Sequence, residues 1–152
     1  GVKLIEYNAR LGDPEAMNVL SILDTDLIDI CNAIGAGTLD ELDVSFQAKA
    51  TVCKYAVPEG YPDNPTKGKV IDISSVSNKN SLFFASVEAK DNKILEAGSR
   101  TIAAIGIADS ISEAEEIAEE QISRIKGPLF YRKDIGTKKL IKKRVEHMKS
   151  LR

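Results

Sequence analysis

The residues with the clearest capacity for chemistry lie near the beginning of the 152-residue sequence, in the pattern Glu6-x-Asn8-x-Arg10. If residues 2–10 form a strand, its period of two places these three polar side chains on one face. A carboxylate and an amide oxygen two residues apart can bind one hard cation, and Mg²⁺ favours a few such oxygens plus nucleotide phosphates. Arg10 could then hold an anionic substrate group or a developing negative charge. By pattern alone a solvated polar strand face is the commoner outcome, so both interpretations stay open here.

A turn and two short helices are expected to hold this strand in place. Asp13 has the position of a helix N-cap, and Pro14 that of the first helical residue. A second helix is predicted over about residues 26–34, where Gly35 and Gly37 would stop it. These residues therefore predict a strand-plus-helices segment that ends near residue 45.

The sequence changes from helical to strand-like patterning near residues 43–47, where we expect a boundary. Asp91-Asn92 separates two strand patterns and predicts a hairpin, although it lacks the preferred glycine. The apolar run 101–108 is short enough to be a strand buried on both faces. The complete set of strand patterns in this region is 48–57, 69–73, 81–90, 93–96 and 101–108.

Two helices are predicted in this second region. Ser112 and Glu115 have the spacing of a capping box and predict the start of the first helix. The buried face of this helix is expected to carry Ala114, Ile117, Ala118, Ile122 and Ile125. Residues 137–152 form a basic tail with seven Lys or Arg and one Glu, which we expect to be a helix docked on the domain with its charges in water. Together the patterns predict an α+β fold with an antiparallel-rich sheet.

The bulk composition is that of a soluble globular protein, with 43% hydrophobic and 29% charged residues and a net charge of −2. No apolar run approaches the roughly 20 residues that span a bilayer, and no signal-peptide pattern opens the chain. We therefore expect a cytoplasmic protein without membrane partners. Cys31 and Cys53 are expected to be buried thiols rather than a disulfide. The sequence opens at Gly1 without an initiator methionine, as expected of a chain cut from a larger protein.

Residues 2–17 closely resemble the last ATP-grasp segment of phosphoribosylamine–glycine ligases, also called glycinamide ribonucleotide synthetases. Further motifs resemble the C-terminal domain of that family and occur in the same order. The resemblance covers nearly the whole chain except the tail after about residue 141. It implies that residues 1–45 are the C-terminal segment of an ATP-grasp domain and that residues 46–152 are the C-terminal domain with a basic tail helix. The further motifs are Glu59-Gly60-Tyr61-Pro62, Lys67-Gly68, Gly98-Ser99-Arg100 and Phe130-Tyr131-Arg132-Lys133-Asp134-Ile135-Gly136.

The resemblance implies a ligase of purine biosynthesis that activates glycine with ATP as glycyl phosphate. The amine of phosphoribosylamine then attacks this intermediate to give glycinamide ribonucleotide. The resemblance also implies that Glu6 and Asn8 ligate Mg²⁺ or Mn²⁺, and that Arg10 and Asp13 lie beside the reacting groups. It also implies that Arg100 grips the ribose phosphate. Many members have glycine where Ser99 stands here, so the backbone at this turn is expected to differ slightly.

The resemblance also implies that the N-terminal ATP-grasp portion, which holds adenine, triphosphate and glycine, is absent from these residues. We therefore expect the chain to be inactive unless that portion is supplied by another chain. A noncatalytic module is the alternative function, in which the basic helix engages nucleic acid or another protein. Helix docking is favoured over phosphate binding for the tail, so nucleic acid is not the expected partner.

Overall fold

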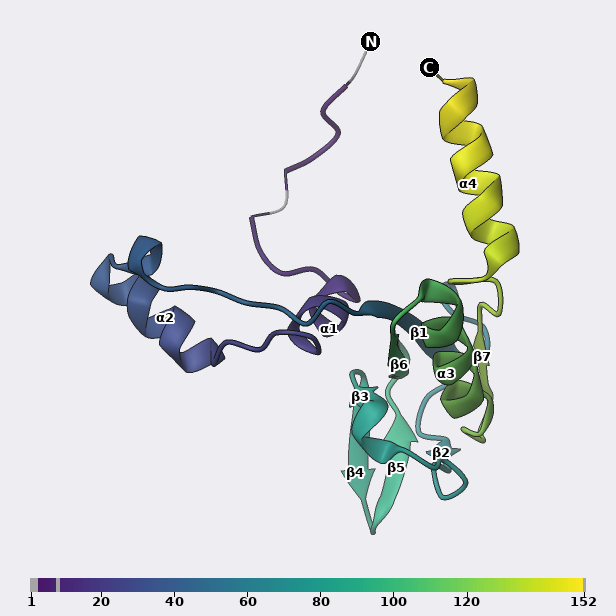
Figure 1. Cartoon of the computed structure of the whole chain (residues 1–152). Helices are drawn as coiled ribbons and strands as arrows, with labels where there is room; N and C mark the ends of the chain where they lie inside the picture. The colour runs from purple at the N-terminus through teal and green to yellow at the C-terminus, as the bar shows by residue number, and fades with distance from the viewer. Residues whose placement is uncertain (1–2, 8, 152) are drawn as a thin grey trace. The chain divides into compact units, whose positions relative to one another are not determined.

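The computed structural model describes residues 3–7 and 9–151 and has a mixed α/β fold with antiparallel sheets, as predicted (Figure 1). It divides into two compact units. The first ends at Ala48 and the second begins at Lys49.

The first unit contains α1 (Glu15–Leu20), α2 (Leu27–Ala36) and the 3₁₀ turn η1 (Leu39–Glu41). The side chain of Asp26 caps α2 by accepting a hydrogen bond from the backbone N–H of Ile28 at 2.7 Å. Gly37 ends α2 in the left-handed conformation, with φ of 73°. The second helix therefore forms as predicted, except that Gly35 lies inside it.

The expected strand over residues 2–10 is wrong for the described part of this segment. Residues 3–7 and 9–10 adopt no regular secondary structure, and Leu4, Ile5 and Tyr7 are exposed. A strand needs a neighbouring strand to which its backbone can hydrogen-bond, and these residues belong to neither sheet of the described structure. Alternation in the sequence therefore did not suffice to make a strand.

The predicted start of the first helix is also wrong by one residue. Pro14, rather than Asp13, occupies the N-cap position, and no side chain caps the helix there. The backbone N–H of Ala16 donates to the carbonyl of Gly12 at 2.9 Å, which closes the turn before the helix. Asp13 thus belongs to this turn.

The second unit is built on a four-stranded antiparallel sheet in the order β3-β6-β1-β7. A smaller antiparallel sheet has the order β2-β5-β4. Helix α3 packs on the larger sheet, and its buried residues join those of β1 and β6 in the core. The elements are β1 (Ala50–Pro58), β2 (Val70–Ile71), η2 (Lys79–Ser81), β3 (Leu82–Phe84), β4 (Val87–Lys90), β5 (Lys93–Glu96), β6 (Ile102–Ala108), α3 (Ile111–Ser123), β7 (Leu129–Tyr131) and α4 (Lys138–Ser150).

Small side chains bring α3 close to the central strand β6. Gly106 on β6 faces Ala114 and Ala118 on α3, and all three are buried. Ala104 on β6 lies in one core cluster with Ile122 of the same helix. A Cβ atom on Gly106 would lie 2.8 Å from the backbone nitrogen of Ala118. The helix therefore rests almost directly on the sheet backbone. The run 101–108 is a buried strand up to Gly106, as predicted, but Ile107 is exposed.

The capping box of α3 lies two residues earlier than predicted. Ser110 caps the helix, and Glu113 completes the box by accepting from the backbone N–H of Ser110. Ser112 and Glu115 therefore lie within the helix, and Glu115 can turn toward the sheet. Ile117 is 36% exposed, so it lies outside the buried face to which it was assigned.

The hairpin at Asp91-Asn92 forms as predicted. Both residues adopt the left-handed conformation, with φ of 50° and 58°. Asp and Asn tolerate this conformation better than other non-glycine residues, so they replace the expected glycine. The predicted strand 81–90 is split, however, because β3 and β4 belong to different sheets.

Helix α4 forms where predicted, and the Thr137 side chain caps it by accepting from the backbone N–H of Leu140. None of its residues is buried, and Val145 and Met148 are about half exposed. The expected docking of its apolar face is therefore wrong beyond the first turn. Lysines flank the narrow apolar stripe, and burying it would remove their charges from water.

None of the helices in the described residues has both the length and the apolar character required to cross a membrane. Neither Cys31 nor Cys53 forms a disulfide with a described residue. Cys31 is exposed and Cys53 is half-buried, so the expectation of two buried thiols is wrong. Cys31 lies on a helix without buried positions.

Candidate functional site

The residues predicted to bind metal and substrate near the beginning of the chain lie in the first unit. Glu6, Arg10 and Asp13 are exposed, and Asn8 lies outside the described residues. The Arg10 guanidinium donates to the carbonyl of Leu11 at 3.1 Å. Within residues 3–7 and 9–151 no three His, Cys, Asp or Glu side chains gather as a metal site. The metal assignment to Glu6 and Asn8 therefore stays a prediction.

Gly12 lies in the turn between Arg10 and Asp13. It is buried, and an added Cβ atom would meet the carboxylate of Glu15. This carboxylate ends a flexible side chain that can move aside, so the contact alone does not require glycine. Arg10 and Asp13 on either side of it are exposed.

The turn that carries Arg100 in the second unit is held by backbone hydrogen bonds on both sides. The N–H of Ser86 donates to the carbonyl of Arg100 at 2.9 Å, and the carbonyl of Ser86 accepts from Ala97 at 3.0 Å. The Thr101 hydroxyl donates to the carbonyl of Ser99 at 2.9 Å. The backbone is thus fixed while the Arg100 side chain is exposed. This arrangement suits recognition of an anion.

The motif around Gly60 folds as a tight loop beside the beginning of β7. Gly60 has φ of 79°, and its carbonyl accepts from Asn64 at 2.8 Å. The N–H of Glu59 donates to the carbonyl of Pro128 at 2.9 Å, and the carbonyl of Glu59 accepts from Thr66. The loop is therefore anchored to Pro128, just before β7, the strand in which the motif of residues 130–136 begins.

The Lys67-Gly68 motif lies against the Arg100 turn. The aliphatic stem of Lys67 crosses Gly98, where an added Cβ atom would approach Lys67 Cγ to 2.9 Å. Gly98 has φ of 87°, so both its backbone and its surroundings favour glycine. The structure thus brings together motifs that are about 30 residues apart in the sequence.

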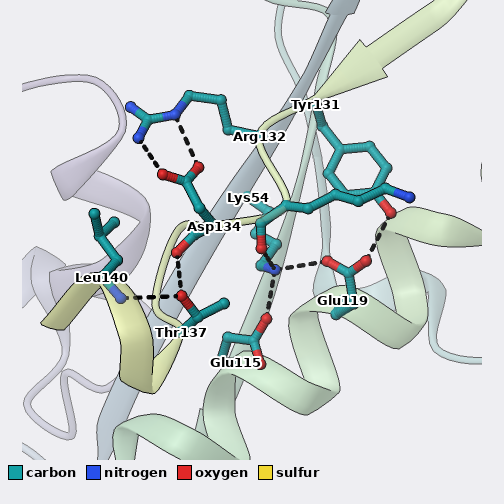
Figure 2. Close-up of polar contacts among 9 residues, drawn as sticks. Lys54, Glu115, Glu119, Tyr131, Arg132, Asp134, Thr137 and Leu140 are labelled. Carbon is teal, nitrogen blue, oxygen red and sulfur yellow. Dashed lines mark hydrogen bonds and ion pairs between the residues drawn. The ribbon is translucent and has the colours of Figure 1, made fainter. Parts of the chain in front are cut away.

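A buried lysine forms the densest polar cluster of the second unit (Figure 2). The Nζ atom of Lys54 on β1 lies 2.6 Å from Glu115 and 2.6 Å from Glu119, both on α3. It also donates to the carbonyl of Lys133 at 3.1 Å, and the Tyr131 hydroxyl donates to Glu119 at 2.8 Å. The Lys54 side chain is fully buried. All three of its N–H donors have partners, so the cluster ties α3, β1 and the segment after β7 together.

This cluster changes the pKa values of two of its members in opposite directions. Desolvation acts to raise the pKa of Glu119, but the hydrogen bonds from Lys54 and Tyr131 outweigh it and the pKa is lowered. Desolvation and the hydrogen bond to Glu119 raise the pKa of Tyr131 to about 12. The folded state therefore favours ionised Glu119 and neutral Tyr131.

These shifts predict stability losses at both ends of the pH range. The contribution of Glu119 is present above its unfolded pKa and is lost as pH falls through the folded value. The contribution of Tyr131 is present below pH 10 and is lost as pH rises from 10 to about 12.

We expect Tyr131→Phe to lower the free energy of unfolding by about 1–2 kcal/mol at neutral pH, because it removes a hydrogen bond to a carboxylate. The variant should also lose less stability than the wild type between pH 10 and pH 12. Urea unfolding at a series of pH values measures both effects. If the free energies of unfolding of the variant and the wild type fall in parallel between pH 10 and pH 12, Tyr131 does not couple to Glu119.

The sequence contained a signal for the Lys54 cluster that our pattern analysis missed. Alternate residues of β1 are buried, and Lys54 falls in register with Val52 and Ala56. Glu115 and Glu119 are four residues apart and therefore lie on one helix face. A lysine at an inward position opposite two such carboxylates predicts a buried ion cluster.

Comparison with known proteins shows that the second unit is the C-terminal domain of a synthetase family. Residues 51–138 match the family model described as phosphoribosylglycinamide synthetase, C domain. The chain belongs to this family, which confirms the resemblance found in its sequence.

Similar proteins share the whole of this chain but are much longer. The phosphoribosylamine–glycine ligase of Methanosarcina barkeri is 53% identical over 152 residues, which are 100% of this chain and 35% of the relative. That of Methanocaldococcus jannaschii is 52% identical over 100% of this chain and 35% of the relative. The crystal structure of the ligase from Thermotoga maritima matches 86% of this chain and 32% of its own, with a TM-score of 0.67 and 29% identity. The chain thus spans about a third of the length of its curated relatives.

Proposed function

We propose that this chain is the C-terminal part of an ATP-dependent ligase that joins phosphoribosylamine and glycine to form glycinamide ribonucleotide in purine biosynthesis. The C-domain match over residues 51–138 carries this proposal. Relatives with the same domain and about 50% identity are named phosphoribosylamine–glycine ligase. ATP, glycine and phosphoribosylamine are the proposed substrates. The free cysteines fit a reducing cytoplasm.

We assign residues 1–45 to the end of an ATP-grasp domain and residues 46–152 to the C-terminal domain. The division of the structure between Ala48 and Lys49 supports a boundary in this region. An N-terminal ATP-grasp portion is the proposed partner of these residues in the complete enzyme.

The proposed reaction has two steps. A carboxylate oxygen of glycine attacks the γ-phosphorus of ATP, which forms glycyl phosphate and releases ADP. The amine of phosphoribosylamine then attacks the acyl carbon and loses a proton, and the carbon–oxygen bond to phosphate breaks. Both steps develop negative charge on oxygen, which positioned cations stabilise.

Glu6 and Asn8 are the residues proposed to hold Mg²⁺ or Mn²⁺, which would neutralise charge on the ATP phosphates. The donor chemistry fits, because carboxylate and amide oxygens suit both ions and Glu6 is exposed to solvent. Arg10 would hold the reacting carboxyl group, and Asp13 would lie beside the amine. The exposure of both side chains, three residues apart, supports this placement.

Arg100 is proposed to bind the ribose phosphate of phosphoribosylamine. Its guanidinium can donate two parallel hydrogen bonds to phosphate oxygens. The fixed backbone between Ala97 and Thr101 and the exposed Arg100 side chain support this role.

We expect Glu6→Ala and Asn8→Ala each to lower kcat of the complete enzyme by about 100-fold or more, since a missing metal ligand misplaces the phosphates. Arg100→Ala should instead raise KM for phosphoribosylamine more than KM for ATP. Arg132→Ala is the matched control, because Arg132 is exposed and pairs only locally with Asp134 in the described structure. Steady-state kinetics with each substrate varied in turn separates these roles.

Two results would overturn these assignments. Near wild-type turnover of Glu6→Ala at low Mg²⁺ would remove the metal role, and an Arg100→Ala defect confined to ATP would remove the phosphate role. Failure of the complete enzyme to release ADP with glycine and phosphoribosylamine would refute the proposed function itself.

The alternative of a noncatalytic binding module rests on α4, whose residues are unburied and largely basic. Its charge would bind phosphate backbones with a steep dependence on salt. Membership in the synthetase family favours the ligase, so we do not assign nucleic acid as a partner.

A further inference from the structure

The side chain of Glu96 at the end of β5 is the least satisfied polar group among the described residues. Glu96 is 1% exposed, and neither of its carboxylate oxygens has a hydrogen-bond partner in that part of the chain. Buried carboxylates are normally paired, because an isolated charge without solvent is strongly unfavourable. A buried carboxylate in this position therefore requires a neutralising partner.

The backbone holds Glu96 firmly in this position. Its carbonyl accepts from Gly68 at 2.8 Å and its N–H donates to the carbonyl of Lys69 at 3.0 Å, while Val87 pairs with it from the other side. Gly68 and Lys69 thus lie opposite the single residue Glu96, and Gly68 has φ of 71°. This is the pattern of a β-bulge that begins with glycine. Glu96 is anchored between two neighbours and cannot move its backbone toward solvent.

A second unsatisfied oxygen lies on the adjoining segment. The hydroxyl oxygen of Thr66 is buried and has no partner among the described residues. Thr66 is two residues before Gly68, and the next residue, Lys67, crosses Gly98. Residues 67–69 therefore run beside residues 96–98, and Thr66 is two residues from Gly68, whose N–H donates to the carbonyl of Glu96.

The nearby lysines do not neutralise Glu96. Lys67 and Lys69 flank the bulge in sequence, but both are exposed and neither pairs with Glu96 in the described residues. We infer that Glu96 and Thr66 form part of a site for a small dehydrated monovalent cation, such as K⁺ or Na⁺. Such ions take oxygen ligands from carboxylates, hydroxyls and backbone carbonyls.

Charge balance and space decide between the classes of ligand. A monovalent cation with one carboxylate gives a neutral buried pair, whereas a divalent cation would leave one uncompensated charge. Mg²⁺ also keeps several waters in an octahedral shell, for which a solvent-free position has no room. The ammonium group of a substrate amine is about as large as K⁺, but the rest of the molecule would need a path to solvent, and the Glu96 oxygens have no contact with solvent. This site is thus independent of the proposed ligase reaction.

The inference is tested by thermal unfolding of the 152-residue chain in KCl, NaCl and choline chloride at one ionic strength. Choline is too large to enter, so it controls for general salt effects. The unfolding midpoint should be higher in KCl or NaCl than in choline chloride by roughly 5 °C. This shift is expected when the ion concentration is about ten times the dissociation constant. Glu96→Gln should abolish the difference, and Glu88→Gln, an exposed glutamate on neighbouring β4, should retain it.

A second measurement locates the ion directly. Crystals grown with Rb⁺ in place of K⁺ should show anomalous density beside Glu96. Equal midpoints in all three salts would overturn the inference. A salt difference that persists in Glu96→Gln, or Rb⁺ density only at other positions, would also overturn it.

Discussion

Replacement of Lys54 by alanine is expected to lower the free energy of unfolding by about 3–5 kcal/mol, the cost of breaking a buried ion pair from one side. Lys54 is fully buried, and its ammonium group separates the carboxylates of Glu115 and Glu119. Its loss leaves two neighbouring carboxylates on one helix face without their cation and also leaves the carbonyl of Lys133 without this donor. Urea unfolding followed by circular dichroism measures the effect.

Lys49→Ala provides the matched control for this experiment. Lys49 also pairs with a carboxylate, that of Asp109, but the two side chains are 41% and 81% exposed. Exposed ion pairs contribute about 0–1 kcal/mol, so this variant should remain close to the wild type. Equal losses in the two variants would mean that burial of Lys54 does not determine its contribution.

A Lys54→Met variant separates the charge from the packing of the side chain. Methionine restores much of the apolar volume, yet Glu115 and Glu119 still lose their shared cation. We therefore expect Lys54→Met to remain well below the wild type in its free energy of unfolding at neutral pH. The difference should shrink as pH falls through the pKa of Glu119, which, despite desolvation, the hydrogen bonds from Lys54 and Tyr131 lower in the wild type.

The sequence predicts elements best where local chemistry alone determines them. Helix α2 follows from Asp26 at its N-cap and Gly37 at its end, because a side-chain acceptor and a left-handed glycine act within one turn. The hairpin at Asp91-Asn92 follows for the same reason. These signals need no knowledge of the rest of the fold.

Features that depend on distant partners were less predictable. Residues 3–7 have the alternation of a strand, but a strand also requires a neighbour, which no described segment provides. The basic helix α4 has an apolar stripe, yet periodicity does not reveal whether any surface covers Val145 and Met148. Local pattern gives the amphipathic character of such segments and leaves their packing undetermined.

The candidate site also contains some features that the sequence indicated and others that depend on distant parts of the fold. The resemblance to a known family marked the segments at Gly60 and Gly98, and both glycines have positive φ angles in the structure, which explains their residue type. The buried charges of Lys54 and Glu96 were missed, since a charged residue in a strand pattern is usually taken to face solvent. Their recognition requires knowing which strand face α3 or the bulge at Gly68 covers.

Replacement of Gly106 by valine is expected to cost more than about 3 kcal/mol, at or beyond the upper end of overpacking effects. An added Cβ atom would clash with the carbonyl oxygen of Ala114 and lie 2.8 Å from the backbone nitrogen of Ala118. These are backbone atoms of α3, so no side-chain rotation relieves the contact. The helix must move away from β6, which would also separate Lys54 from its carboxylates.

A size series distinguishes this steric effect from a general intolerance of β6 to substitution. Gly106→Ala should be less damaging than Gly106→Val, because it adds only the Cβ atom. Gly35→Ala is the opposite control, since Gly35 lies inside α2 with no atom within 4 Å of an added Cβ. Alanine there should stabilise the helix by roughly 0.5–1 kcal/mol. If Gly106→Val unfolds at the same urea concentration as the wild type, then α3 does not rest on the backbone of β6. Close packing of α3 would then not be the reason for glycine at position 106.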